Sequence, residues 1–201
     1  MTPEEIERRS FAIIEAELGH MSVPEEYAPV VKRVIHATAD FDFARTLCFS
    51  PGAVPAAVAA FRRGAHIVTD TNMAAAGIQK PRLAAWGGEA HCLVADADIA
   101  AIAKERGITR SRAAVDRAAE LWPEAIYAVG NAPTALMRIH ELIALGTLRP
   151  ALVVGVPVGF VNVVESKELI LQSPVPHIVA LGRKGGSAVA AAICNALMNM
   201  A

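Results

Sequence analysis

The sequence predicts an α/β protein with three layers, α/β/α, built on a mainly parallel five-stranded sheet with two extra N-terminal helices. One observation behind this is that short apolar segments rich in β-branched residues alternate with helical patterns from residue 65 onward. Another is that 54% of the 201 residues are hydrophobic but only 5% are aromatic, which supplies an aliphatic core. We therefore expect a single domain spanning residues 1–201.

Strands are expected where β-branched residues cluster between glycine, proline or polar residues. The central strand is Ala-Leu-Val-Val-Gly at 151–155, which follows Pro150 and is apolar throughout, as in a strand covered on both faces. Further strands are predicted at residues 65–69, 91–94, 125–129 and 176–181.

Two helices are expected ahead of the strand–helix units, packed outside them. Thr2, Pro3 and the glutamates that follow form a helix start, and Gly19 ends that helix. The second helix begins at Pro24 and runs into residues 36–40. The remaining helices are predicted at residues 54–63, within 70–77, at 98–106, 111–121 and 133–145, after 165, and after 187.

Composition and charge exclude several classes of protein. A net charge of −1 gives the protein no overall electrostatic attraction to nucleic acid or to an anionic membrane. No apolar stretch reaches the ~18 residues needed to span a bilayer, and the acidic N-terminus does not resemble a signal peptide. The cysteines, Cys48, Cys92 and Cys194, form no CxxC motif and suggest reduced thiols. These features together predict a cytoplasmic protein.

Polar side chains follow three of the predicted strands, in loops that parallel strands would bring to one edge of the sheet. Backbone N–H groups at helix starts, together with Arg and Lys, form anion-binding sites. The side chains in question are Asn131, Thr134, Ser166, Lys167, Arg183, Lys184 and Ser187.

Other interpretations of these loops remain open. The stretch 156–162 is also compatible with an ordinary strand–helix connection, and Gly185-Gly186 with close packing of a helix on the sheet. Residues 183–187 also suggest a phosphate cradle. The sequence contains neither G-x-x-x-x-G-K-[ST] nor G-x-G-x-x-G after a strand, which argues against nucleotide binding.

His36 is the candidate for proton transfer. It lies at the end of its predicted helix, four residues from Lys32 and from Asp40 and three from Arg33, so charges of both signs surround it. The alternative is a surface or packed histidine without a chemical role. The other histidines, His20, His66, His91, His140 and His177, have no metal-binding spacing and no cysteine partners, so we expect no metal site.

Two arginines at predicted helices also suggest anion binding. Arg110 begins a helix, where the helix dipole disfavours a cation unless an anion is bound nearby. Arg9-Ser10 lies on the first helix, where a solvated turn is the alternative. No G-x-S-x-G motif supports a hydrolase.

Taken together, these segments resemble the precorrin-8X methylmutase family of corrin biosynthesis. One departure from the family pattern is Asn162-Val-Val164, where small residues are expected. The matching segments run in order along nearly the whole chain: Arg9-Ser-Phe-Ala-Ile-Ile-Glu-Ala-Glu17, Val34-Ile-His-Ala37, Asp70-Thr-Asn-Met73, Thr109-Arg-Ser111, Gly130-Asn-Ala-Pro-Thr-Ala-Leu136, Gly155-Val-Pro-Val-Gly-Phe-Val161, Glu165-Ser-Lys167 and Gly182-Arg-Lys-Gly-Gly-Ser187.

The resemblance implies an isomerase that moves a methyl group from C-11 to C-12 of precorrin-8X, giving hydrogenobyrinate, or of cobalt-precorrin-8, giving cobyrinate. It also implies a homodimer with the tetrapyrrole near the subunit interface and no organic cofactor. A non-catalytic corrinoid carrier is the alternative function.

The resemblance makes His36 the catalytic acid and assigns the other residues to binding the polycarboxylate ring. Arginines are expected to hold its carboxylates, polar side chains to donate hydrogen bonds, and Val158 with Phe160 to face the ring. The expected substrate-binding residues are Arg9, Ser10, Arg33, Asn72, Met73, Arg110, Asn131, Thr134, Gly159, Phe160, Glu165, Ser166, Lys167, Arg183, Gly186 and Ser187.

Overall fold

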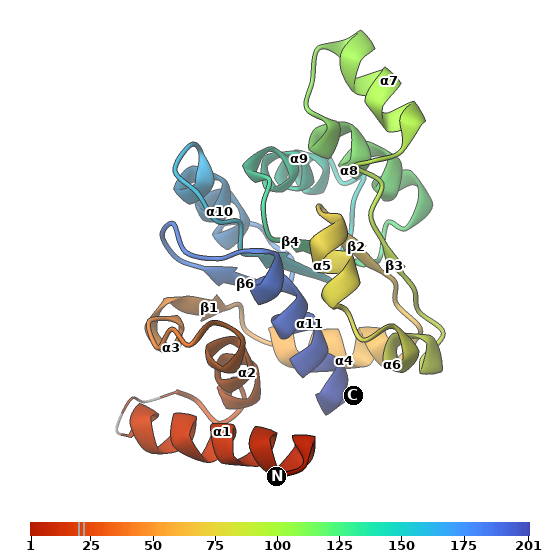
Figure 1. Ribbon diagram of the computed structural model, residues 1–201. Helices are drawn as coiled ribbons and strands as arrows, with labels where there is room; N and C mark the ends of the chain where they lie inside the picture. The colour runs from red at the N-terminus through yellow and green to blue at the C-terminus, as the bar shows by residue number, and fades with distance from the viewer. Residues whose placement is uncertain (20, 22) are drawn as a thin grey trace.

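The computed structural model describes residues 1–19, 21 and 23–201 (Figure 1). The described residues form a six-stranded sheet in the order β1-β6-β5-β4-β2-β3. All neighbouring strands are parallel except β1, which pairs antiparallel with β6. The strands are β1 Leu47–Phe49, β2 Ile67–Thr69, β3 Ala90–His91, β4 Ile126–Val129, β5 Leu152–Gly155 and β6 His177–Ala180.

The three-layer α/β/α prediction is confirmed, with a correction to the sheet: it has six strands rather than five in the part of the chain described. The extra strand, β1, follows a one-turn helix, α3 (Phe43–Thr46). Three residues are too few to show the alternation of apolar and polar residues that marks a strand, so the pattern missed it. The strand predicted at residues 91–94 is also corrected: β3 begins one residue earlier, at Ala90, and already ends at His91.

Alternate residues of the central strands face two separate cores, as the two-residue period of a strand requires. On β4, Ile126 and Ala128 join one cluster of buried residues, whereas Tyr127 and Val129 join the other. The first face is covered by α2 (Ala28–Thr38), α4 (Ala53–Arg62), α5 (Asn72–Gly77) and α11 (Ser187–Met200). The second is covered by α8 (Arg110–Leu121), α9 (Pro133–Ala144) and α10 (Val163–Leu171).

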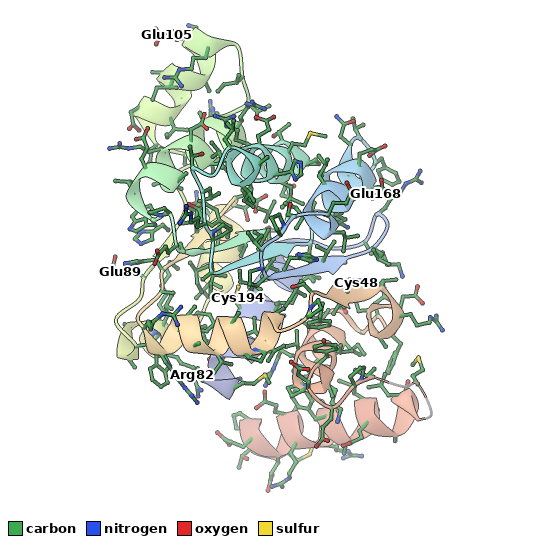
Figure 2. All side chains as sticks on the ribbon, turned by 180° about the vertical axis from the view of Figure 1, so that it is seen from behind. Cys48, Arg82, Glu89, Glu105, Glu168 and Cys194 are labelled. Atoms are coloured by element: carbon green, nitrogen blue, oxygen red, sulfur yellow. The ribbon has the colours of Figure 1, made fainter. Side chains whose placement is uncertain are left out.

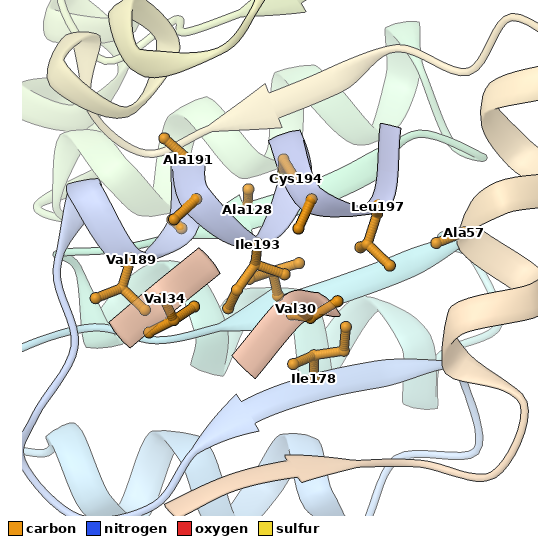
Figure 3. Packing of buried hydrophobic residues seen from close by; sticks show 14 of the residues in the cluster. Val30, Val34, Ala57, Ala128, Ile178, Val189, Ala191, Ile193, Cys194 and Leu197 are labelled. Atoms are coloured by element: carbon orange, nitrogen blue, oxygen red, sulfur yellow. The ribbon is translucent and has the colours of Figure 1, made fainter. Parts of the chain in front are cut away.

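The helix α11 is the centre of the first core. Figure 3 shows Ile193 and Cys194 of α11 packed among Val30 and Val34 of α2 and Ile178 of β6. The helix α2 is therefore part of the helical layer, which corrects the expectation that both N-terminal helices pack outside the unit. An apolar stripe on a short helix gives no information about which partner it meets, so only the tertiary contacts place α2.

The helix α1 (Pro3–Leu18) does lie outside that layer, against α2 (Figure 1). Its start is the expected one: the Thr2 hydroxyl accepts from the backbone N–H of Glu5, and the Glu5 carboxylate accepts from the N–H of Thr2. Ile14 and Leu18 are buried, whereas Ile6 and Ile13 are each 50% exposed. The helix thus covers α2 with one side and leaves apolar surface on the other.

Two further helices lie beyond β2 in the chain. The helix α6 (Lys80–Ala85) was not predicted, and α7 (Ala97–Arg106) packs on α8 through a small separate cluster containing Ile99 and Ala103. Figure 2 labels Glu89, next to β3, and Cys48, on β1, at opposite edges of the sheet. Among the described residues, no helix is both long and apolar enough to cross a membrane.

Candidate functional site

The candidate site is built at the carboxyl edge of four adjacent parallel strands, β6, β5, β4 and β2. Each of these strands leads into a loop and then a helix: β2 into α5, β4 into α9, β5 into α10 and β6 into α11. Open α/β sheets place ligands beyond this edge. The convergence of the loops, expected from the sequence, is therefore observed.

Asp70 joins the loop after β2 to the loop after β4. Its carboxylate accepts hydrogen bonds from the backbone N–H groups of Gly130 (2.9 Å), Asn131 (2.8 Å) and Ala132 (2.6 Å). Burial raises the pKa of Asp70, and the three N–H donors oppose that rise. Asp70 was not among the predicted site residues, although its position at the end of a predicted strand is a signal that indicates such a role.

Ser187 and Gly130 bring the loop after β6 against the loop after β4. A Cβ atom on Gly130 would lie 2.7 Å from the backbone nitrogen and Cα of Ser187, so only glycine fits. The Ser187 hydroxyl lies 2.7 Å from the hydroxyl of Thr71 at the start of α5. The predicted ligand donor Ser187 is thus held between two loops.

Gly185 and Gly186 pack against the loop after β5. A Cβ atom on Gly185 would lie 2.1 Å from the carbonyl oxygen of Val156, which itself accepts the N–H of Gly186 at 2.8 Å. Farther along, the N–H of Gly159 donates to the carbonyl of Arg183 at 3.1 Å. The double glycine thus allows a close approach, but between two loops at Gly185 rather than between a helix and the sheet, as one interpretation of the sequence expected.

Lys167 lies beneath these loops rather than on their surface. Its side chain is 1% exposed, and its ammonium donates to the carbonyl oxygens of Gly182 (2.7 Å) and Lys184 (2.8 Å). Burial lowers the pKa of Lys167 to about 8. Ser166 is also buried, and its hydroxyl donates to the carbonyl of Val163 at 2.9 Å. Their direct contact with a ligand stays a prediction; Lys167 has, in addition, a structural role that the sequence did not indicate.

The loop after β5 presents a large apolar surface. Phe160 is 82% exposed, Val161 is 76% exposed and Val158 is 48% exposed. The Arg183 guanidinium lies 5.4 Å from the centre of the Phe160 ring, within cation–π range. An exposed apolar patch with an arginine beside it is suited to a flat ligand that carries carboxylates.

His36 lies in the last turn of α2 with its side chain exposed. Its ring stacks on Phe11 of α1, with ring centres 5.1 Å apart, and Arg33 covers the same Phe11 ring at 4.7 Å. An open cavity of about 460 Å³ is lined by His36 and by Pro3, Glu4, Ile6 and Glu7 of α1. The imidazole is therefore held in place and accessible.

The charged neighbours predicted for His36 have other partners. Lys32 pairs with Glu15 at 2.9 Å and Arg33 pairs with Glu7, both on α1. Asp40 pairs with Lys184 at 2.7 Å, and Lys184 also reaches Asp42 at 2.6 Å. This last contact links the region after α2 to the loop after β6, so the segment carrying His36 is tied to the carboxyl edge.

The other predicted residues lie on several elements. Arg110 is exposed in the first turn of α8, and the preceding Thr109 caps that helix and donates to Thr134 at 2.9 Å. The Ser10 hydroxyl donates to the backbone of its own helix, at the carbonyl of Ile6. Among the predicted substrate-binding residues, those that are exposed and have no side-chain hydrogen bond or ion pair among the described contacts are Arg9, Asn72, Met73, Arg110, Asn131, Phe160, Glu165 and Arg183.

Comparison with known proteins agrees with the resemblance noted from the sequence. A family model described as precorrin-8X methylmutase matches residues 5–200. The chain is 46% identical over 204 residues to a cobalt-precorrin-8 methylmutase of Salmonella typhimurium, covering 98% of this chain and 94% of that protein. It is 42% identical over 194 residues to a precorrin-8X methylmutase of Pseudomonas aeruginosa, covering 96% and 93%.

Comparison with a solved structure shows that the fold is shared as well. The precorrin-8X methylmutase of Thermus thermophilus is 45% identical and has a TM-score of 0.89, covering 97% of this chain and 96% of that chain. Sequence and fold therefore agree over almost the full length of both proteins. The chain belongs to the precorrin-8X methylmutase family, the isomerases of cobalamin biosynthesis.

Proposed function

We propose that this isomerase moves a methyl group from C-11 to C-12 of precorrin-8X or cobalt-precorrin-8, with His36 as the proton donor. The observation that carries the proposal is the position of His36. It is exposed, it is stacked on Phe11 so that its orientation is restricted, and it belongs to the segment that matches the family's catalytic one. An imidazole held in this way is suited to protonating a macrocycle near the bond that breaks.

The proton makes the methyl migration easier because it withdraws electron density from the carbon that the methyl group leaves. The enzyme then has to hold one conformation of a large ring, and the arginines supply the charge for this. Arg9, Arg110 and Arg183 are exposed, and Arg33, which covers the Phe11 ring, has as its ion-pair partner Glu7, a carboxylate whose side chain is 48% exposed. Exchanging a surface ion pair for a substrate carboxylate costs little, about 0–1 kcal/mol.

The ring itself is proposed to lie against Val158, Phe160 and Val161. Exposing three large apolar side chains in one loop is unfavourable unless a ligand or partner covers them. A corrin ring is flat and mainly apolar at its centre, while its carboxylates lie on the periphery. Arg183, next to the Phe160 ring, is positioned to pair with such a peripheral carboxylate.

We also propose that the active protein is a cytoplasmic homodimer. The apolar loop 158–161 and the cavity beside His36 are both open in a single chain, and a second copy related by a two-fold axis would enclose the ligand. Cys48, Cys92 and Cys194 are free thiols, as is usual in a reducing compartment. Light scattering tests the assembly: a monomer that retains full activity at working concentration would contradict it.

A spectroscopic assay tests the function itself. Each substrate form, metal-free and cobalt-containing, is incubated with less than one equivalent of protein, and the visible spectrum is recorded over time. Conversion of many equivalents supports an enzyme and shows which form is used. Conversion of no more than one equivalent would instead support the non-catalytic corrinoid carrier, for which the comparisons give no support.

A further inference from the structure

A second cluster of chemically reactive side chains lies away from the candidate site. His66 directly precedes β2, and its carbonyl accepts the N–H of Ile126 at the start of β4. It is therefore at the amino end of the sheet, whereas Asp70 is at the carboxyl end of the same strand, about 13 Å farther along the chain. Pairing of β2 with β3 brings His91 beside His66, although 25 residues separate them.

We propose that His66, Glu89 and His91 form a binding site for a divalent transition metal of the Zn²⁺ type. The Nδ1 atom of His66 and the Nε2 atom of His91 are 3.1 Å apart. A Glu89 carboxylate oxygen lies 4.0 Å from the same Nε2 atom, and the three ligand atoms are all within 4.8 Å of one another. Two imidazoles and a carboxylate are a ligand set that zinc and its neighbours accept.

The spacing of the two nitrogens fits a shared metal. Ligands at about 2.0–2.1 Å from zinc, separated by a tetrahedral angle, lie about 3.3 Å from each other. The observed 3.1 Å is within a few tenths of that value. The Glu89 side chain is 74% exposed, so it has the freedom to turn toward the two nitrogens.

Neighbouring groups hold the two rings in this arrangement. The His91 ring stacks on Trp122, with ring centres 3.8 Å apart and planes 14° apart. The backbone N–H of Glu89 donates to the Nδ1 atom of His66 at 3.2 Å, so this nitrogen carries a lone pair rather than a proton. Without metal, the Nε2–H group of His91 is then the donor to that same lone pair.

Metal binding requires one tautomeric change, in the His91 ring. Neither ring loses a proton overall. The Nε2 proton of His91 moves through solvent to the Nδ1 atom of the same ring, and both facing nitrogens then present lone pairs. The metal replaces the hydrogen bond between the rings and that from the Glu89 N–H. This arrangement leaves a coordination position for water or an external ligand, because three protein ligands do not complete a tetrahedral site.

The site borders a separate cavity. A pocket of about 390 Å³ is lined by His66 and Trp122 together with Arg63 and Glu124. Figure 2 labels Glu89 on the outer edge of the molecule, on the side of the sheet opposite Cys48. The metal would therefore be reached from solvent without passing through the loops that carry the candidate active site.

Metal titration of the untagged, chelator-treated protein tests the proposal. Calorimetry with Zn²⁺ is expected to show about one site per chain, and Co²⁺ is expected to give the intense visible absorption of a four-coordinate ion. His66→Gln, His91→Gln and Glu89→Gln should each weaken binding at least about tenfold, the scale for damage to a metal site. The control His140→Gln, at a histidine that contacts Ser173 instead, should bind as the wild type does.

Folding is followed in parallel, because His91 packs on Trp122 and its replacement can destabilise the chain. Glu89→Gln keeps the test valid, since an exposed side chain contributes little to folding. Zn²⁺ should also raise the Tm of the wild type more than that of Glu89→Gln at the same concentration, because binding only to the folded state stabilises it in proportion to the affinity. The proposal is overturned if the wild type binds no Zn²⁺, or if the three glutamine variants bind it as tightly as the wild type.

Discussion

The Lys167 ammonium lies 2.7 Å from the carbonyl oxygen of Gly182, at the base of the loop that carries Arg183. The same ammonium reaches the carbonyl of Lys184, so one buried cation holds both sides of the turn. The sequence predicts a ligand contact for this lysine. That contact stays a prediction, and the contacts of Lys167 within the chain indicate, in addition, that it positions the loop from below.

Lys167→Met should loosen this loop and lower the stability of the protein. The substitution keeps the length of the side chain but leaves two carbonyl oxygens without a donor, which costs about 1–3 kcal/mol. Urea unfolding measures the stability, and limited proteolysis within residues 181–186 measures the order of the loop. Glu168→Met, at the neighbouring exposed position, is the matched control and should change neither. Equal stability of the Lys167 variant and the wild type would contradict the positioning role.

The pH dependence of stability should also depend on Lys167. Burial lowers its pKa from 10.5 to about 8. Between these two values the unfolded chain holds the proton more often than the folded chain, so the contribution of Lys167 to the free energy of unfolding rises with pH. Below this window both states are protonated and the contribution is constant. The difference in stability between wild type and Lys167→Met should therefore increase across this window; a difference that stays flat or falls would rule out the lowered pKa.

Asp70→Asn should disturb the junction of the loops after β2 and β4. The carboxylate accepts three backbone N–H groups, whereas an amide turns its own NH₂ group toward one of those donors. We expect a loss of about 1–3 kcal/mol in unfolding free energy and a fall in activity, since Asn131 is on this loop. Asp96→Asn, at an exposed carboxylate, is the control. Circular dichroism melts and the visible-spectrum assay measure the two effects; unchanged values would show that the junction is not needed.

His36→Ala should separate chemistry from folding. The side chain is exposed, so the unfolding free energy should change by no more than about 1 kcal/mol. The rate at saturating substrate should fall by about 10²-fold or more, the usual scale for loss of a general acid. Lys32→Ala, one turn earlier on α2, should keep its rate. If His36→Ala turns over at nearly the wild-type rate, the proton comes from another group.

Arg110→Ala should behave differently from His36→Ala. An arginine that pairs with a carboxylate acts on substrate and product alike, so the affinities for both should fall together. Titration with product and the Michaelis constant for substrate measure the two effects. A loss of rate with unchanged product affinity would place Arg110 in the chemical step instead.

Gly185→Ala tests the close contact between the loops after β5 and β6. The new methyl carbon would lie 2.1 Å from the Val156 carbonyl oxygen, so the backbone has to move. Gly146→Ala is the comparison: it adopts a positive φ of 72° but has open space, so it costs only about 1–2 kcal/mol of backbone strain. The free energy of unfolding should fall more for Gly185→Ala than for Gly146→Ala, and the activity of Gly185→Ala should also fall. A smaller loss than that of Gly146→Ala would mean that the loops adapt to the methyl group.

Much of the fold was determined by local sequence. The apolar, β-branched runs at 125–129, 151–155 and 176–181 contain β4, β5 and β6, because such side chains favour a strand buried on both faces. The glutamate and threonine at the start of α1 cap it as expected. The ordered motifs along the chain also identified the family, and this needed no structure.

Tertiary structure alone decided how distant segments meet. β1 becomes a strand only because Leu47 lies opposite Ala180, and a three-residue segment carries too little pattern to predict this. The histidines 66 and 91 show no metal-binding spacing, yet strand pairing places their ring nitrogens 3.1 Å apart. Lys167 has the chemistry of an anion-binding residue, but the packing of α10 under the β6–α11 loop turns it inward. The sequence determines which chemical groups are present and which local elements they favour. How deeply each group is buried, and which groups it contacts, depends on tertiary contacts that a linear pattern does not contain.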